Sequence, residues 1–326
     1  MKALQFQPIL KQTIWGGDKI AALKHLCHAP KHVGESWEIA DFEGGTTPVA
    51  EGEHKGLTLS QLIEQEGAAL LGRRNFERYG TRFPLLIKFL NPESELSIQV
   101  HPDDEVAAKR HGCKGKTEMW YIIGARPGAH LLSGMKEQLD PSKYVDYVRG
   151  GHIVDALARY DVKEGDVFFL PAGRVHAIGG GCYLAEIQET SDITYRIYDY
   201  NRLGLDGKPR ELHTEQAKDV IDYSVLPDYR TFYEHQNDSE VNLVKCSHFT
   251  TGLLELSRPY QRPLDDCGSF LVLISLEGNC TIRTGTESLT LSPGQAVLIP
   301  ANADVAAGAV TIIPTEDNTK LLTTHI

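Results

Sequence analysis

The chain has 326 residues, of which 41% are hydrophobic and 24% are charged, and its formal net charge is −11 at pH 7. This composition is that of a globular protein, long enough for two domains and able to bury a sizeable core. The negative net charge argues against a general binder of nucleic acid or of anionic membranes. It does not exclude an anionic small molecule, which responds to local charge.

The N-terminus and the cysteines indicate a cytoplasmic protein. The opening MKALQFQPILKQTIWGG has neither a long apolar run nor a small-residue cleavage site, so we expect no signal peptide. No stretch of about 18 apolar residues predicts a membrane-spanning helix. The six cysteines are scattered without a C-x-x-C pair, as is typical of reduced thiols rather than of a disulfide framework.

Along the chain, short apolar runs alternate with Gly, Pro, Asn and Asp, which predicts a mainly β fold of barrels or sandwiches. Expected strands include residues 83–90, 96–100, 119–123, 167–170, 271–276 and 296–299. Apolar residues at helical spacing predict short helical insertions at about 57–71, 142–160 and 211–221. Thr58 or Ser60 can cap the first insertion, and Gly150–Gly151 splits the second into two helices.

A polar segment without periodicity, residues 227–238, marks the expected junction between two domains. The first domain would comprise residues 1–238 and the second residues 239–326.

Two stretches repeat one frame of glycine and proline. The first, GDVFFLPAGRVH, runs from Gly165 to His176 and resembles the second signature of the cupin β-barrel. The other, GQAVLIPANADV, begins 129 positions later at Gly294 and ends at Val305, without the histidine. We therefore expect two cupin (jelly-roll) barrels, the second of which lacks the metal site.

Strand alternation gathers metal-ligand side chains in the first barrel. Gln99 and His101 share one face of the expected strand SIQVH, Glu118 begins a second strand, and His176 follows a Pro-x-Gly turn. Two imidazoles, a carboxylate and an amide oxygen suit a catalytic zinc site with an open position, although iron, manganese or cobalt accept the same ligands. Each residue alone is more often an ordinary turn or strand residue. Their joint occurrence with a full cupin signature predicts the metal site.

Basic residues cluster around this expected site. Arg196 and Arg202, with Lys116 and the Ser97 hydroxyl, predict a local positive pocket suited to phosphate. The alternative is a surface ion pair between Arg196 and Asp192, which share a strand face.

Lys116 lies two residues from the expected ligand Glu118. A dication nearby disfavours the ammonium form, so the pKa of this lysine should fall and allow it to move protons near neutral pH. The alternative is an exposed lysine in a polar turn, as Lys114 suggests.

Together these residues resemble the type I mannose-6-phosphate isomerases in their shorter bacterial form. The resemblance covers most of residues 10–215 and rests on IWGG (14–17), GESWEIAD (34–41), FPLLIKFLNPESELSIQVHPDD (83–104), GKTEMWYI (115–122), GDVFFLPAGRVHAIGGG (165–181) and ETSDITYRIYDYNR (189–202). Residues 240–326 carry no comparably strong signature.

The resemblance implies a zinc-dependent interconversion of mannose 6-phosphate and fructose 6-phosphate through a cis-enediol(ate). It implies one Zn²⁺ per chain, held by Gln99, His101, Glu118 and His176. Lys116 and Arg196 match the active-site lysine and arginine, and Asp192 matches the acidic residue four positions before that arginine. Ser97 and Arg202 match positions suited to the substrate phosphate, Arg202 by distance from Arg196 rather than by identity.

Two other classes of function remain open at this point. One is another metal-dependent cupin enzyme, either a phosphoglucose isomerase of cupin type or a dioxygenase. The other is a non-catalytic cupin that binds a sugar phosphate. For the isomerase, the expected partner is a small-molecule sugar phosphate, with no membrane. We expect no nucleic acid, because no DNA-binding helix pair or basic region is visible.

Overall fold

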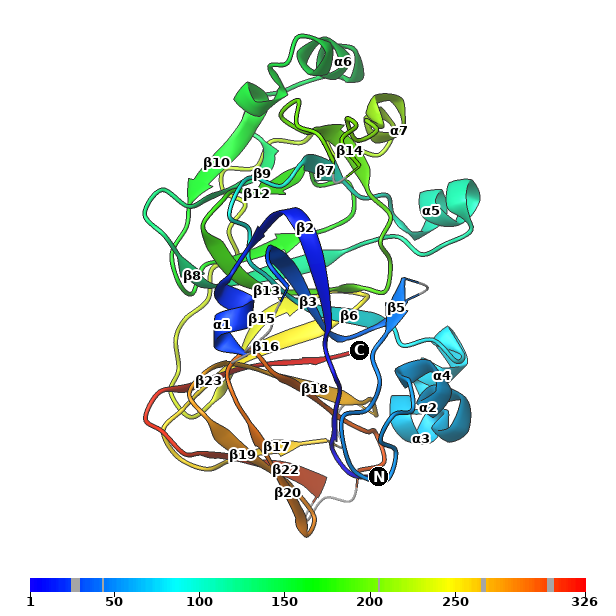
Figure 1. Ribbon diagram of the computed structural model, residues 1–326, viewed down its shortest axis with the longest axis vertical. Helices are drawn as coiled ribbons and strands as arrows, with labels where there is room; N and C mark the ends of the chain where they lie inside the picture. Colours follow the sequence, from blue (N-terminus) through cyan, green and yellow to red (C-terminus); the bar gives the residue numbers. More distant parts are fainter. Residues whose placement is uncertain (25–29, 43, 205, 265–267, 304–307) are drawn as a thin grey trace. The chain divides into compact units, whose positions relative to one another are not determined.

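The computed structural model describes residues 1–24, 30–42, 44–204, 206–264, 268–303 and 308–326 (Figure 1). Contacts divide the chain into two compact units. The central unit comprises Leu10–Ser36 and Ile87–Thr231, and the terminal unit comprises Met1–Ile9, Trp37–Leu86 and Phe232–Ile326. None of the described helices is long and apolar enough to cross a membrane.

This division differs from the single junction expected near residue 238, because the terminal unit contains both ends of the chain. Its β1 (Leu4–Gln5) pairs with β21 (Ala296–Ile299), and Leu4 lies opposite Leu298. Pairing between segments so far apart leaves no mark on local composition, so the pattern of residues 227–238 alone does not reveal it.

Two sheets form the central unit, and the fold is mainly β as predicted. The first sheet has the order β10 (Leu157–Asp161), β9 (His130–Met135), β12 (His176–Ile178), β7 (Ile98–Val100) and β14 (Tyr195–Tyr198). The second has the order β11 (Val167–Leu170), β8 (Glu118–Ala125), β13 (Cys182–Glu189), β6 (Leu85–Leu90), β3 (Val33–Ile39) and β2 (Ile9–Gly17).

Short helices are inserted between the strands of the central unit. They are α1 (Lys19–Leu23), α5 (Asp104–His111), α6 (Pro141–Arg149), the 3₁₀ helix η1 (Ile153–Ala156) and α7 (Thr214–Lys218). The insertion expected at 142–160 therefore contains two helices around Gly150–Gly151, but its end is the strand β10. Asp140 caps α6, because its carboxylate accepts hydrogen bonds from the backbone N–H groups of Ser142 and Lys143.

Three of these helices, α6, η1 and α7, pack on one face of the first sheet. Tyr144 of α6, Ile153 of η1 and Ala217 of α7 belong to one buried apolar cluster. On the sheet side the cluster includes alternate strand residues, among them Ile98, Val100, Tyr195 and Ile197. Because successive strand residues face opposite ways, the residues between them project from the other face.

The terminal unit is also built from β-sheets. A six-stranded sheet has the order β1, β21, β18 (Leu271–Glu277), β23 (Thr319–His325), β16 (Thr250–Leu256) and β15 (Glu240–Lys245). A four-stranded sheet has the order β17 (Tyr260–Pro263), β22 (Ala309–Pro314), β19 (Cys280–Thr284) and β20 (Glu287–Leu291). A small ribbon pairs β4 (Asp41–Phe42) with β5 (Gly45–Thr46).

The helices expected at 57–71 lie in the terminal unit as α2 (Leu59–Glu66) and α3 (Ala68–Leu71), followed by α4 (Arg73–Tyr79). Thr58 is the N-cap of α2, and it forms a capping box with Gln61 in which each side chain bonds the backbone N–H of the other.

Candidate active site

Four polar side chains lie in one row across the first sheet of the central unit. Ser133 is paired with His176, His176 with Gln99, and Gln99 with Arg196, on β9, β12, β7 and β14 in turn. Directly opposed residues of antiparallel strands project from the same face. The row therefore lies on the face opposite the helices, as the alternation in SIQVH predicts.

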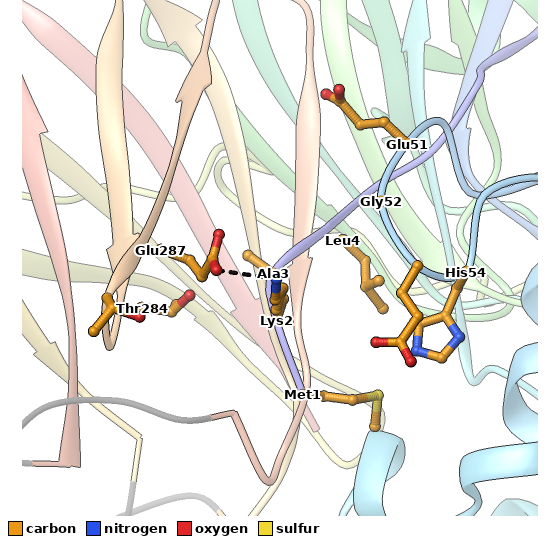
Figure 2. A pocket seen from close by; sticks show the side chains of 11 residues that line it. Met1, Lys2, Ala3, Leu4, Glu51, Gly52, His54, Thr284 and Glu287 are labelled. Atoms are coloured by element: carbon orange, nitrogen blue, oxygen red, sulfur yellow. Dashed lines mark ion pairs between the residues drawn. The ribbon is translucent and has the colours of Figure 1, made fainter.

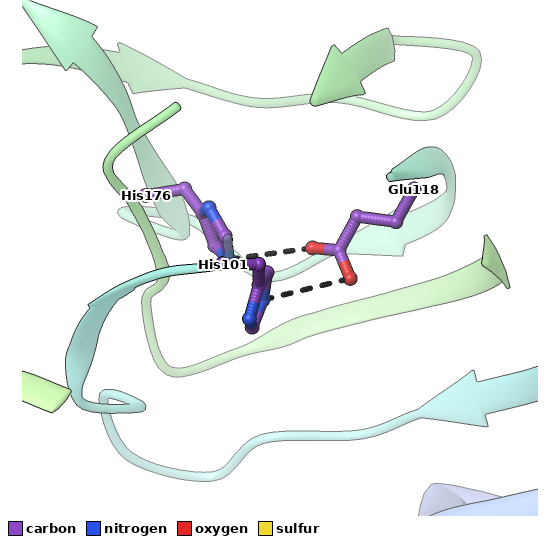
Figure 3. A group of neighbouring side chains, drawn as sticks. All are labelled: His101, Glu118 and His176. Atoms are coloured by element: carbon purple, nitrogen blue, oxygen red, sulfur yellow. Dashed lines mark ion pairs between the residues drawn. The ribbon is translucent and has the colours of Figure 1, made fainter. Parts of the chain in front are cut away.

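His101, Glu118 and His176 meet next to this row, with one ligand atom of each within 4.8 Å of the others (Figure 3). His176 Nε2 lies 3.3 Å from Glu118 Oε1, and His101 Nε2 lies 3.9 Å from Glu118 Oε2. All three side chains are at most 2% exposed. The fold thus brings together three of the four predicted metal ligands, although the first and the last of them are 75 positions apart in the sequence.

Gln99, the fourth predicted ligand, reaches the same point. Its amide Nε2 lies 3.3 Å from His176 Nε2. Oxygen and nitrogen of an amide have nearly the same shape, so a half-turn of the amide group brings the oxygen toward the imidazoles.

Backbone carbonyls fix the orientation of both imidazoles. His101 Nδ1 lies 2.7 Å from the carbonyl oxygen of Ile193, and His176 Nδ1 lies 2.8 Å from that of Arg174. A carbonyl only accepts, so each Nδ1 carries the proton and each Nε2 keeps a lone pair directed at Glu118. This is the tautomer that metal-ligating histidines adopt when their second nitrogen is hydrogen-bonded.

Burial favours the neutral form of each group. It lowers the pKa of His176 to about 4 and lowers that of His101 well below its usual range. It also raises the pKa of Glu118 to about 7. Neutral imidazoles are the form that binds metal, and a dication beside Glu118 would favour the carboxylate.

The donor atoms at this point fit a metal ion. Among the described residues, His101 Nε2 and Glu118 Oε1 are buried without a hydrogen-bond partner, and Glu118 Oε2 faces the Lys116 ammonium at 3.0 Å. Buried polar atoms normally have such partners, so unpaired acceptors directed at one point indicate a cation site. Two imidazole nitrogens and a carboxylate, with an amide oxygen alongside, are ligands that zinc accepts.

Lys116 and Glu118 share a face, as predicted, and the Lys116 ammonium lies 3.0 Å from Glu118 Oε2. The Lys116 ammonium also lies 4.0 Å from Glu186 Oε1, and the Lys116 side chain is only 5% exposed. The exposed-turn alternative therefore does not describe Lys116. It does describe Lys114, whose side chain is 56% exposed.

A buried charge network behind Lys116 was not predicted. Lys88 of β6 lies 3.2 Å from Glu186 Oε1 and 3.5 Å from Glu35 Oε2, and Trp120 donates a hydrogen bond to Glu186 at 2.9 Å. Burial alone would lower the pKa of Lys88, but Glu186 and Glu35 outweigh it and hold that pKa above its usual range. The sequence does contain a signal for this network, since Lys88 is a charged residue inside the apolar strand LLIKFL. A charge buried in such a strand needs a partner of opposite charge.

A cavity of about 210 Å³ opens beside these groups. Five predicted site residues line it, namely Ser97, Gln99, Lys116, Asp192 and Arg196. The remainder of its described lining is Trp15, Glu35, Lys88, Leu90, Leu96, Glu186, Thr194 and Arg210. Gln99 and Lys116, which contact His176 and Glu118, thus connect the metal-ligand group with a cavity that carries both cationic and acidic side chains.

Arg202 occupies a different place from the other predicted site residues. Its guanidinium bonds the Asp199 carboxylate and the carbonyl oxygen of Glu95, and Arg202 is not among the described residues that line the cavity. Arg210, which was not predicted, lines the cavity and bonds the same Asp199 through Nε at 2.7 Å and Nη2 at 2.6 Å. Asp199 therefore holds both arginines.

A second cavity, of about 340 Å³, lies in the terminal unit (Figure 2). Lys2 and Glu287 form an ion pair of 3.0 Å there, with side chains 63% and 54% exposed. Its other charged or titratable described residues are Glu51, Glu53 and His54, together with the N-terminal Met1. Solvated groups of this kind do not make a buried ligand set, so the first cavity is the better candidate.

The repeat in the terminal unit supports no metal site in the described part of that unit. Asn302 follows β21, and Val305, the position matching His176, lies outside the described residues. The core between its sheets is apolar and includes Leu254, Leu273 and Ile312. Within its described residues alone, no three metal-ligating side chains lie together.

Comparisons with known proteins give consistent matches along most of the chain. The family model for the catalytic domain of phosphomannose isomerase type I matches residues 3–158, and the model for the cupin domain of mannose-6-phosphate isomerase matches residues 239–313. Mannose-6-phosphate isomerase ManA of Bacillus subtilis is 36% identical over 91% of this chain and 92% of its own. A mannose-6-phosphate isomerase of Streptococcus mutans is 32% identical over 91% and 92%.

A solved structure gives the same result. The crystal structure of mannose 6-phosphate isomerase from Bacillus subtilis matches all of this chain and all of its own, with a TM-score of 0.88 and 29% identity. The apo form of the enzyme from Salmonella typhimurium, at 16% identity and a TM-score of 0.76, shares the fold.

Proposed function

Because this chain belongs to the type I phosphomannose isomerases, we propose that it is a zinc-dependent aldose–ketose isomerase. It interconverts mannose 6-phosphate and fructose 6-phosphate through a cis-enediol(ate). The observation that carries this proposal is the buried group of His101, Glu118 and His176. Two residues that contact this group, Gln99 and Lys116, also line a cavity with further ammonium and guanidinium groups.

Gln99, His101, Glu118 and His176 would hold one Zn²⁺ per chain. When bound, the ion supplies a Lewis acid that polarises the sugar carbonyl. Three of these side chains are held in place by the protein itself, since two carbonyls hold the imidazoles and β-sheet pairing holds Gln99 beside His176.

The substrate phosphate binds where the hydroxyl of Ser97 and the guanidinium groups of Arg196 and Arg210 line the cavity. Arg210 uses Nε and Nη2 on Asp199, which leaves Nη1 for the ligand. Arg202 contributes indirectly, because it also bonds the Asp199 carboxylate and so helps to fix the position of Arg210. The proposed phosphate pocket therefore uses Ser97, Lys116 and Arg196 of the predicted set, with Arg210 in place of Arg202.

The chemical step moves one proton between neighbouring carbons of the open-chain sugar. A base removes the proton from C2 of the aldose, and the C2–H electron pair forms the C1–C2 double bond of the enediolate. Return of a proton to C1, with transfer of a proton from the O2 hydroxyl to O1, gives the ketose. Lys116 and Asp192 line the cavity and are the candidates for the proton carrier, and Arg196 stabilises the negative charge that develops on oxygen.

The proposal is tested by incubating mannose 6-phosphate with the protein in D₂O and following the products by NMR. We expect fructose 6-phosphate, with deuterium accumulating at C1 of the ketose and at C2 of the aldose as the reaction approaches equilibrium. Absence of fructose 6-phosphate with the zinc-loaded protein would refute the isomerase. Product that stays free of deuterium after many turnovers would refute proton exchange through an enediolate.

A further inference from the structure

Arg196 lies on a strand with an open edge. β14 is the last strand of its sheet, bonded to β7 on one side only. Within the described part of the chain, the backbone of Arg196 therefore has a strand neighbour on one side only. The position of its guanidinium in the cavity depends on how the other side of this backbone is held. Some other group has to satisfy the outward backbone N–H and C=O of Arg196.

His213 does this with two hydrogen bonds. Its backbone N–H donates to the carbonyl oxygen of Arg196 at 2.7 Å, and its ring Nδ1 accepts from the backbone N–H of Arg196 at 3.1 Å. Two residues earlier, the carbonyl oxygen of Glu211 accepts from Arg196 Nη1 at 3.1 Å. The segment 211–213 thus holds both the backbone and the guanidinium of Arg196.

The contact requires one form of the imidazole. An Nδ1 that accepts a hydrogen bond carries no proton, so the ring is neutral with its proton on Nε2. Nε2 lies 3.9 Å from the Glu211 carboxylate, which favours that tautomer. Burial lowers the pKa of His213, and Arg196 and His111 add to this against the opposing effect of Glu211.

The ring is fixed from both sides. His213 is the first residue before α7, and its carbonyl accepts from Ala217 at 2.9 Å. Its ring lies 6.1 Å from the Tyr195 ring, and the Tyr195 hydroxyl bonds His111 Nε2 at 2.7 Å. Helix and sheet together leave the imidazole little freedom to move away from Arg196.

We infer that His213 is a positioning residue for the reaction, which holds Arg196 through a side-chain nitrogen that takes the place of a strand carbonyl. This inference rests on the proposed function, in which Arg196 stabilises charge on the substrate. Arg196 lines the cavity, and its Nε is buried without a hydrogen-bond partner among the described residues. Misplacing such a donor by about 1 Å can lower a rate about 100-fold.

The test compares His213→Asn, whose Oδ1 can accept from the Arg196 N–H, with His213→Leu, which has similar size and no acceptor. His152→Ala, at a 71% exposed histidine of the same unit, is the control. We expect His213→Leu to lower kcat about 100-fold with a smaller change in KM, and His213→Asn and the control to keep most of the activity. Amide hydrogen exchange at Arg196 should be slow in the wild type and in His213→Asn, and fast in His213→Leu.

The outcomes separate the inference from the proposed function. If the zinc-loaded wild type does not isomerise mannose 6-phosphate, the proposed function fails and the inference fails with it. If the wild type is active and folded His213→Leu keeps its kcat, or His213→Asn fails to restore it, the inference alone is wrong. Fast exchange of the Arg196 amide in the active wild type would also overturn it, and this measurement needs no variant.

Discussion

At the residue scale, the Glu118 carboxylate lies at the centre of the candidate site, because both imidazoles and the Lys116 ammonium contact it. Glu118→Gln keeps the shape of the side chain and removes its negative charge. Loss of a hydrogen-bond partner around a metal site already costs about 10–100-fold in affinity, so loss of a ligand should cost at least ~100-fold. We expect zinc content, measured by atomic absorption after dialysis, to fall together with activity.

The control for this variant is Glu105→Gln, at an exposed glutamate of α5 in the same unit. It should keep both zinc and turnover. Full zinc occupancy in Glu118→Gln would contradict the assignment of Glu118 as a ligand.

Lys116 should matter for turnover rather than for metal binding. Lys116→Met removes the ammonium beside Glu118 and keeps a side chain of similar length. Loss of a proton-transfer group costs about 10²–10⁴-fold, so kcat should fall by that range while zinc stays bound. Lys114→Met is a matched control in the same loop, and near wild-type turnover in Lys116→Met would remove Lys116 from the mechanism.

The metal-free protein should lose stability as the pH falls from about 6.5 to 4.5. In this window the unfolded chain binds protons on His101 and His176 that the folded chain does not, because burial lowers both pKa values. Glu118 acts in the opposite direction, since its pKa is raised from 4.5 to about 7 and the folded chain binds its proton. On balance these three groups give the unfolded state about one more proton, so acidification favours unfolding.

Glu118→Gln isolates the part played by Glu118. Without that carboxyl, the slope of unfolding free energy against pH should become steeper by about 1.4 kcal/mol per pH unit in this window. Urea unfolding of chelator-treated wild type and variant at several pH values measures both slopes. Equal slopes would show that Glu118 is already ionised in the folded, metal-free protein.

At the scale of elements, the ion pair of Lys88 on β6 and Glu186 on β13 joins neighbouring strands at the wall of the cavity. Lys88→Met leaves the Glu186 carboxylate buried with less compensation. Removing one partner of a buried pair typically costs about 3–5 kcal/mol, so we expect a loss of that size in the free energy of unfolding. Adding Glu186→Gln to this variant should restore part of the lost free energy of unfolding. If Lys88→Met loses no more stability than the exposed control Lys143→Met, the ion pair contributes little.

The site strands could be predicted from sequence, because alternation fixes which face Gln99 and His101 share and because Glu118 and His176 stand in a known frame. The contribution of Arg210 could not. It lies 14 residues beyond Arg196 and reaches the cavity only through its bonds to Asp199. Neither periodicity nor a motif reports such a tertiary ion pair. The same holds for His213, whose role depends on an open strand edge.

At the scale of the whole molecule, both units are β-sheet structures. The group of His101, Glu118 and His176 lies entirely in the central unit. The composition of the terminal unit could not be predicted, since β1 joins it by pairing with β21, close to 300 residues away. The roles of residues 1–238 as catalytic domain and 239–326 as degenerate cupin remain predictions.

The most direct test of the central claim is isomerisation of mannose 6-phosphate before chelation, after chelation and after addition of zinc. We expect activity to disappear with the chelator and to return with zinc, because the buried side chains of His101, Glu118 and His176 hold their ligand atoms within 4.8 Å of one another. Activity that persists in protein shown to be free of metal would contradict the account. A folded, zinc-loaded protein without activity would contradict it equally.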